Sequence, residues 1–312
     1  MNDPKRLAVA FCGLGRMGEQ MARRIVDAGF ELTAYNRNAA VAAEFADRTG
    51  AAWARTPRDA AARADVVITM LTDGPAVLGV LNGPDGVLAG LAGNGAVVDC
   101  STTGAEYARS AAAMCTATGG VFLDSPVSGS TAVASVGELG LMVGGDPEVL
   151  RRVEPVLRAF AKTIVHVGGD GAGAATKVAV NGLLHSFNTA LAESLVVAER
   201  HGVPRALLFE VLSNSVLSNR YLDYKSEGFV HPEKASIAFD LQTASKDLRL
   251  AMSAAQTAHV HASLIERALE IHQRAVADGY GQDDISALAT WFDRVPQQAQ
   301  GPASNFRTPE RT

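Results

Sequence analysis

A short apolar run followed by a glycine-rich turn constrains the fold of this chain more than any other feature. Residues 6–12 are nearly all apolar, which is typical of a central parallel strand covered on both faces. They lead directly into Gly13-Leu-Gly-Arg-Met-Gly18, after which residues 19–28 have helical character that ends at Gly29. The sequence therefore predicts a strand, a tight turn and a helix, which together form the first half of a βαβ unit.

The glycines of this turn have the spacing of a dinucleotide-binding loop. Gly13 permits the tight turn, Gly15 lets a pyrophosphate approach the backbone, and Gly18 allows the helix to pack closely on the strand. The N–H groups at the start of the helix would bind the anion. The alternative is a turn with a purely structural role. The predicted cofactor contacts in this loop are Gly13, Leu14, Gly15, Arg16, Met17 and Gly18.

The second predicted strand, residues 31–35, ends without the acidic residue that would hold the ribose hydroxyls of NAD. An acid there would repel a 2′-phosphate, whereas Arg37 can form charged hydrogen bonds with it and Asn36 and Asn38 can donate further ones. These three residues favour NADP (NADPH) over NAD as the cofactor. The alternative is that Arg37 is a solvated residue at a helix start.

Strand-like runs alternate with alanine-rich helical segments as far as residue 167, which predicts a doubly wound α/β sheet. Ligands of such sheets bind at the carboxyl ends of the strands, so Leu71, Thr72 and Thr102 are expected beside the cofactor. Helix capping is the alternative role of the hydroxyls in these turns. The further expected strands are residues 65–71, 96–100, 121–123, 139–143 and 163–167.

A long apolar helix is predicted over residues 171–200, and it carries one lysine on a polar stripe. After Lys177 no charged side chain follows for more than four helical turns. Asn181, His185 and Asn188 follow at spacings of four, four and three, which places all of them on one helix face. A lysine on this face would lie partly out of water, and desolvation lowers its pKa toward the range useful for proton transfer. Lys177 is therefore the candidate general acid/base. The alternative is that the helix only links two domains or forms the core of a dimer, with its polar groups merely satisfied by hydrogen bonds.

The length of 312 residues favours two domains. Residues 204–294 have a helical pattern throughout, which predicts an all-α second domain. The expected division is a dinucleotide-binding domain at residues 1–168, an interdomain helix at 169–200, an all-α domain at 201–296 and a disordered tail at 297–312.

Charge and cysteine usage exclude several classes of protein. The net charge is −5 and no basic run follows a phosphate backbone, which argues against a nucleic-acid partner. Cys12, Cys100 and Cys115 lack metal-ligand spacing, so we expect free thiols, no metal site and a cytoplasmic location. The first residues form no apolar signal segment and polar residues interrupt the long helix, so no membrane span is expected.

Two further stretches carry polar groups suited to a binding site. Asp124-Ser-Pro-Val-Ser-Gly-Ser130 follows a predicted strand and can bind a small carboxylate; the alternative is a loop whose serines only cap the backbone. Lys246 lies on a predicted helix between apolar residues, and its alternative role is a solvated ion pair with Asp247.

Together, these stretches resemble the β-hydroxyacid dehydrogenase family, which includes 3-hydroxyisobutyrate dehydrogenases, tartronate semialdehyde reductases and glyoxylate/succinic semialdehyde reductases. The likeness covers nearly the whole chain. It implies a Rossmann-type doubly wound sheet followed by an all-α C-terminal domain, joined by a long interdomain helix. It also implies an NADP-dependent oxidoreductase that interconverts a small 3- or 4-hydroxy acid and its semialdehyde, assembled as a homodimer or homotetramer.

The resemblance also implies roles for single residues. Lys177 would be the catalytic lysine, and Asn181 would orient the substrate beside it. Lys246 would reach toward the nicotinamide and the substrate, and Thr102 would contact the cofactor from the sheet. The substrate carboxylate would be bound by Ser128, Gly129 and Ser130.

Three positions depart from the family's pattern. Ser130 stands where many members have a second glycine, Ala105 where many have proline, and Asn36-Arg37 replaces the acidic signature of members that use NAD. The last departure agrees with NADP and resembles the semialdehyde-reductase branch. The alternative functions are an imine reductase or a sulfonated-aldehyde reductase on the same scaffold, and a non-catalytic NADPH-binding module. Imine reductases generally lack a lysine at the position of Lys177.

Overall fold

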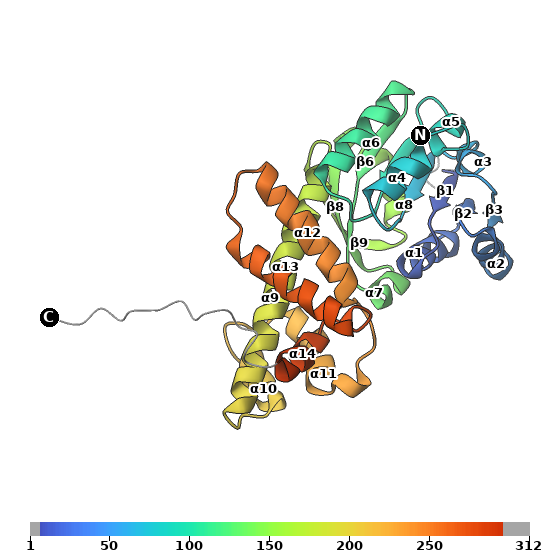
Figure 1. Ribbon diagram of the computed structural model, residues 1–312. Coiled ribbons are helices and arrows are strands. Elements are labelled where there is room, and N and C mark those ends of the chain that lie inside the picture. The colour runs from blue at the N-terminus through green and yellow to red at the C-terminus, as the bar shows by residue number, and fades with distance from the viewer. Residues whose placement is uncertain (1–6, 296–312) are drawn as a thin grey trace. The chain divides into compact units, whose positions relative to one another are not determined.

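The computed structural model describes residues 7–295, and Figure 1 shows the order of their helices and strands. The disordered tail expected at 297–312 lies outside the described residues. The chain groups into two compact units: Met1–Leu184 with Lys246–Glu266, and His185–Ser245 with Arg267–Thr312. The domain boundaries expected from the sequence remain a proposal.

Among the described residues, nine strands of the first unit form one sheet in the order β3-β2-β1-β4-β5-β6-β8-β7, with β9 paired to β8. The first six strands pair in parallel, whereas β8 runs antiparallel to β6 and β7. The doubly wound sheet is therefore confirmed, with antiparallel pairs added at one side. The strands are β1 (Val9–Cys12), β2 (Leu32–Tyr35), β3 (Ala52–Trp53), β4 (Val66–Thr69), β5 (Ala96–Asp99), β6 (Val121–Asp124), β7 (Val127–Ser128), β8 (Leu139–Gly145) and β9 (Ala161–Gly168).

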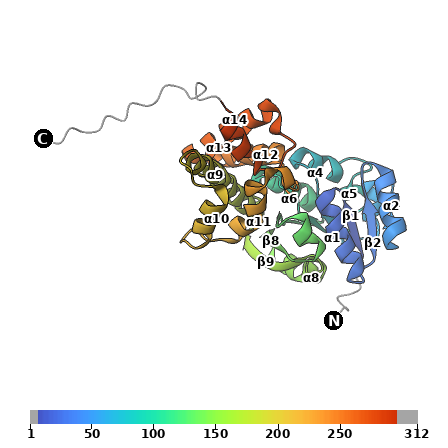
Figure 2. The same ribbon diagram turned by 90° about the horizontal axis from the view of Figure 1, so that it is seen from below.

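Helices cover both faces of this sheet. The side chains of β1 alternate between two buried clusters: Val9 and Phe11 pack on one face, and Ala10 and Cys12 on the other. Figure 2 shows α4, α5 and α6 on the opposite side of the strands from α1 and α8. The helices of this region are α1 (Arg16–Asp27), α2 (Ala39–Thr49), α3 (Pro57–Ala61), α4 (Gly74–Leu81), α5 (Val87–Gly90), α6 (Ala105–Ala117), α7 (Thr131–Ser135) and α8 (Pro147–Leu157).

The sequence did not predict the two shortest strands, β3 and β7. Each has two residues, which is too short for an alternating pattern to be recognised. Val127 and Ser128 lie inside the stretch expected to be a turn, and they form a strand because they pair with Leu141 and Gly140 of β8. Asp124, expected to open that turn, is the last residue of β6.

Within the described residues the second unit is built of helices, in agreement with the all-α C-terminal domain that the sequence predicted. Its core includes Leu191 and Leu195 from the long helix, packed with Phe209, Phe229 and Trp291. Outside the named strands, the part of the chain that the structure describes adds one isolated bridge, between residues 240 and 284. The elements after the sheet are α9 (Ala172–Arg200), α10 (Arg205–Ser213), α11 (Arg220–Val230), η2 (Pro232–Lys234), α12 (Leu241–Thr257), α13 (Ser263–Ala275), η3 (Val276–Tyr280) and α14 (Ala287–Arg294).

The predicted long helix is present as α9, and its 29 residues give a length on the order of 40 Å. Its first part belongs to the first unit and its remainder to the second. No helix within residues 7–295 is long and apolar enough to cross a membrane.

Candidate functional site

The glycine turn between β1 and α1 has the geometry of an anion-binding loop. Gly13 has φ +109°, and a Cβ there would overlap the carbonyl of Met70. A Cβ on Gly18 would overlap the carbonyl oxygen of Gly13, so this position must be glycine for the helix to start so close to the turn. Around Gly15 there is open space, and within the described chain no side chain caps the start of α1. The first N–H groups of α1 therefore suit a pyrophosphate.

The end of β2 is tied to the glycine turn by Asn36. Its Oδ1 accepts a hydrogen bond from the Leu14 N–H (3.1 Å), and its Nδ2 donates to the carbonyl of Asn38 (3.1 Å). Asn38 caps α2 by accepting from the Ala40 N–H (3.2 Å). Arg37, between the two asparagines, is exposed. Both asparagines thus order the loop that presents the Arg37 side chain.

The ends of β4 and β5 are joined by buried hydrogen bonds. Asp99 Oδ1 accepts from the Thr69 hydroxyl (2.7 Å) and from the Ser101 N–H (3.1 Å), and Ser101 Oγ accepts from the Leu71 N–H (2.8 Å). Burial raises the pKa of Asp99. Ser101 therefore links two strand ends, and α4 is capped by the Asp73 carboxylate rather than by a hydroxyl of these turns.

Lys246 of α12 lies at these same two strand ends. Its Nζ donates to the carbonyl of Thr72 (3.1 Å) and to that of Thr102 (3.4 Å). It also forms an ion pair with Asp247 at 3.3 Å. Asp247 is only 2% exposed, so the pair is not a solvated pair on a helix surface. Lys246 thus contacts both loops in which cofactor-binding residues were predicted.

Lys177 and Asn181 of α9 belong to the same cluster. Asn181 is 3% exposed and its Nδ2 donates to Asp247 Oδ2 at 2.7 Å. Burial lowers the pKa of the half-buried Lys177; the charge of Asp247 opposes this effect and that of Lys246 adds to it. The structure therefore brings together two residues from α9 and two from α12. Asp247 was missed as a site residue because the sequence does not show its burial.

The predicted carboxylate-binding residues lie between β7 and α7. Ser128 is exposed, and Gly129 has φ +135°, a conformation that side chains rarely adopt. Ser130 Oγ caps α7 by accepting from the Val133 N–H at 3.4 Å. The capping role considered for these serines thus applies to the Ser130 side chain. The predicted carboxylate binding is then left to the Ser130 backbone N–H and the Ser128 hydroxyl.

Two family models match the chain. Residues 8–168 match a family described as the NAD binding domain of 6-phosphogluconate dehydrogenase. Residues 171–292 match one described as the NAD-binding domain of NADP-dependent 3-hydroxyisobutyrate dehydrogenase. The chain belongs to the β-hydroxyacid dehydrogenase family. It is accordingly an NAD(P)-dependent oxidoreductase that acts on hydroxy acids and their semialdehydes.

Relatives within the β-hydroxyacid dehydrogenases differ in their named substrates. The NAD-dependent L-serine dehydrogenase of Pseudomonas aeruginosa is 36% identical over 298 residues, covering 94% of this chain and 99% of its own. The 3-sulfolactaldehyde reductase of Escherichia coli is 33% identical, with 90% and 94% covered. The structure of Mycobacterium tuberculosis 3-hydroxyisobutyrate dehydrogenase with L-serine has a TM-score of 0.84 at 33% identity, with 93% and 100% covered.

The polar stripe of α9 continues into the second unit, where it has structural contacts. His185 packs against Phe239, with ring centroids 5.3 Å apart, and against His272 at 6.0 Å. Asn188 donates to the Ile285 carbonyl (3.1 Å) and accepts from the Tyr221 hydroxyl. Burial lowers the pKa of His272 to about 3, so this ring is neutral at physiological pH. His185 and Asn188 therefore have packing and hydrogen-bonding roles within the second unit.

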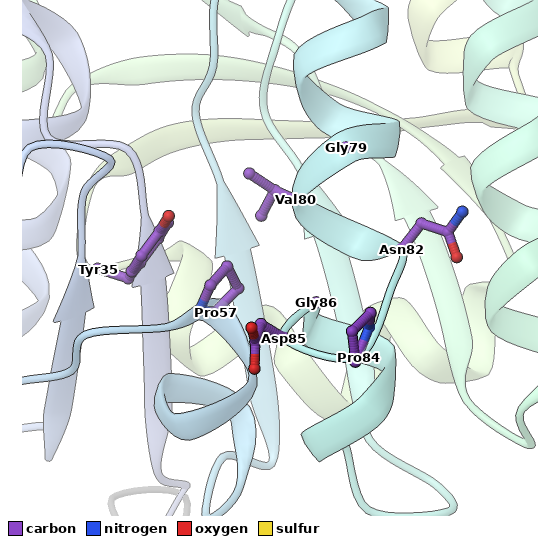
Figure 3. A pocket seen from close by; sticks show the side chains of 8 residues that line it. All are labelled: Tyr35, Pro57, Gly79, Val80, Asn82, Pro84, Asp85 and Gly86. Atoms are coloured by element: carbon purple, nitrogen blue, oxygen red, sulfur yellow. The ribbon is translucent and has the colours of Figure 1, made fainter.

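A hollow of about 280 Å³ lies beside the end of β2. Figure 3 shows Val80 of α4 between the Tyr35 ring and Asn82, with Pro57 below Val80 and Tyr35. Burial raises the pKa of the Tyr35 phenol, and the charge of the nearby Arg37 opposes this rise. The lining residues are Tyr35, Pro57, Gly79, Val80, Asn82, Pro84, Asp85 and Gly86.

Proposed function

We propose that this β-hydroxyacid dehydrogenase interconverts a small 3- or 4-hydroxy acid and its semialdehyde with NADP, and that Lys177 is its general acid/base. The observation that carries this proposal is the half-buried Lys177 beside the buried Asn181–Asp247 pair. A lysine whose pKa is lowered by burial can hold and release a proton nearer neutral pH than a solvated one.

In the reducing direction, the Lys177 ammonium donates a hydrogen bond to the aldehyde oxygen and then transfers its proton there. A bound nicotinamide cofactor supplies the hydride. Asn181 uses one N–H for Asp247, so its second N–H and its Oδ1 can orient the substrate. Asp247 fixes that amide and its charge favours the protonated lysine. Ser128, Gly129 and Ser130 bind the carboxylate.

The preference for NADP rests on the end of β2. Arg37 is exposed on a loop ordered by Asn36 and Asn38, and no acidic side chain follows the strand to repel a 2′-phosphate. The hollow beside Tyr35 suits the adenine ring in size, and its Val80 and Pro57 offer apolar walls to a base (Figure 3). The start of α1, which no side chain of the described residues caps, receives the pyrophosphate of the cofactor.

Replacing Arg37 with alanine is expected to raise the KM for NADPH at least about tenfold, because charge-assisted hydrogen bonds to the 2′-phosphate are lost. The KM for NADH should change little. Steady-state rates with each cofactor measure this ratio. Arg63→Ala is the matched control, since Arg63 is exposed but precedes the amino end of β4. An unchanged NADPH/NADH ratio in Arg37→Ala would contradict the NADP assignment.

A substrate panel tests the reaction itself. We expect turnover of at least one small semialdehyde among succinic semialdehyde, methylmalonate semialdehyde, tartronate semialdehyde and glyoxylate, with NADPH preferred over NADH. L-serine with NADP, 3-sulfolactaldehyde and a cyclic imine complete the panel, because similar proteins are named for the first two and imine reductases share the fold. Cofactor binding without any turnover would instead indicate a binding module.

A second candidate is the sulfonated-aldehyde reductase, which the 33% identity to the E. coli enzyme favours. A sulfonate is an anion like a carboxylate, so the Ser128–Ser130 turn suits either. The presence of Lys177 argues against the imine reductase. We also propose a homodimer or homotetramer, since α9 exposes the apolar residues Val180, Leu183 and Val197.

A further inference from the structure

We infer that Asp124 is a positioning residue that anchors both the helix of Lys177 and the turn of Ser128–Ser130 to one point of the sheet. The inference rests on the proposed function, because it assigns Asp124 a role through those two parts of the site. Asp124 is the last residue of β6 and is 1% exposed. It touches neither substrate nor cofactor in this role and acts through the groups that it holds.

The first anchor point is the start of α9. Asp124 Oδ1 accepts a hydrogen bond from the Gly171 N–H (2.8 Å), and Oδ2 accepts one from the Ala174 N–H (2.7 Å). Ala174 lies in the first turn of α9, where an N–H has no partner within the helix, and Gly171 directly precedes the helix. Lys177 follows Ala174 by three residues, slightly less than one turn. The orientation of the first turn therefore sets the direction in which Lys177 leaves the helix.

The helix start is also packed tightly on the sheet. A Cβ on Gly173 would lie 2.9 Å from the Gly144 nitrogen, and one on Gly144 would lie 2.8 Å from the Gly173 nitrogen. Backbone thus meets backbone between α9 and β8, and the Asp124 Oδ1 lies beside this contact, 2.5 Å from the position of a Cβ on Gly144. In this close approach the Asp124 carboxylate bonds directly to the helix end, which leaves little freedom for the helix to tilt.

The second anchor point is the turn that follows β6. Ser125 N–H donates to the Asp99 carbonyl (2.7 Å), and two residues later Val127 and Ser128 pair with β8. Both ends of this short segment are therefore fixed to strands. Because the same residue, Asp124, ends β6 and caps α9, the spacing between the carboxylate-binding turn and Lys177 depends on it.

Burial and hydrogen bonding act on the charge of the Asp124 carboxylate in opposite directions. Burial raises the pKa of Asp124, the N–H groups of Ala174 and Gly171 lower it, and the charge of Asp170 raises it. Asp99 on the adjacent strand is a second buried acid whose own pKa is raised by burial and by Asp124. The hydrogen bonds from the two backbone N–H groups replace the lost hydration of the carboxylate, and the positive end of the α9 dipole favours its charge.

The test is Asp124→Asn, which keeps the size of the side chain but offers one acceptor oxygen to two N–H groups. We expect amide hydrogen exchange in residues 171–178 to accelerate at least about tenfold, from the loss of one charge-assisted hydrogen bond. The kcat should fall by a similar factor with the NADPH dissociation constant nearly unchanged, because the glycine turn is not touched.

The pH profile separates positioning from charge. A loosened first turn would hydrate Lys177, so the high-pH limb of semialdehyde reduction should move upward, toward the ordinary lysine pKa of 10.5. Asp247 and Lys246, the charged groups that act on Lys177 from α12, are unchanged in the variant. Removing a nearby negative charge alone would move the limb downward.

Asp170→Asn is the matched control, since it removes the same charge beside the same helix end while both Asp124 bonds remain. It should behave like the wild type in exchange and kcat, and any change of its pH limb should be downward, opposite to the change expected for Asp124→Asn. If Asp124→Asn does not fold, Asp124→Glu keeps the carboxylate, displaces the helix start by one methylene and should show the same changes.

Wild-type exchange and an unmoved pH limb in Asp124→Asn, or equal effects in Asp170→Asn, would overturn the inference. Failure of the proposed function has a different signature: the exchange of residues 171–178 would still respond to Asp124→Asn, but replacement of Lys177 would leave turnover intact.

Discussion

Replacing Lys177 with methionine is expected to lower the kcat for semialdehyde reduction about a hundredfold or more, the scale of a general acid/base group. Methionine keeps an unbranched apolar stem, so the packing of α9 should survive the change. The loss arises because no ammonium stabilises the charge that develops on the carbonyl oxygen or supplies its proton. Steady-state turnover measures the effect, and a fluorescence titration measures NADPH binding separately.

The NADPH dissociation constant of Lys177→Met should stay close to that of the wild type. Lys162→Met is the matched control, because Lys162 is a lysine of the same unit whose side chain is 66% exposed and paired with Glu138. It should retain full activity. Turnover near the wild-type rate in Lys177→Met would show that another group supplies the proton.

The rates of reduction and oxidation by the wild type should change with pH in opposite directions. In the proposed mechanism, reduction uses protonated Lys177, so its rate should fall as pH rises through the pKa of this residue, which burial lowers from 10.5. Oxidation requires the neutral amine and should rise over the same interval. Asp247 opposes the lowering, so Asp247→Asn should move both limbs to lower pH.

Local sequence patterns were sufficient to predict the cofactor-binding part of the fold. Gly18 is required by its contact with Gly13, inside the first βα unit. Gly13 itself adopts φ +109°, a local requirement of the turn, although its close neighbour Met70 follows β4. The strand, the turn and the helix are therefore all encoded within about twenty residues. Likewise, the spacing of Lys177 and Asn181 fixes their shared helix face before any tertiary contact is known.

The acids of the site could not be predicted in this way. Asp247 follows Lys246 directly and looks like half of a solvated ion pair, and only its contact with Asn181, 66 residues away, shows that it is buried. Asp124 lies 50 residues from Ala174, the farther of the two amides that it caps. Such pairs depend on how the chain folds back on itself, which residue spacing does not contain. The same limit applies to β7, whose two residues become a strand only by pairing with β8.

Asp284→Asn is expected to lower the free energy of unfolding of the second unit by about 3–5 kcal/mol, the usual cost of breaking a buried ion pair. Both Asp284 oxygens accept from Lys225 Nζ at 2.8 Å, and the two side chains are 3% and 5% exposed. The carboxylate also accepts from the N–H groups of Ala238 and Phe239. The substitution leaves a buried ammonium without its counter-charge, and a chemical denaturation curve measures the loss.

Tryptophan fluorescence can follow this unit by itself. The chain has two tryptophans, and Trp291 is 3% exposed in the core of the second unit, so a Trp53→Phe background makes it the only reporter. Glu227→Gln, at an exposed position on α11, should change the midpoint little. Adding Lys225→Met to Asp284→Asn should recover part of the loss, because the unpaired charge is then removed. Equal destabilisation by Asp284→Asn and Glu227→Gln would mean that the pair contributes no more than a surface charge.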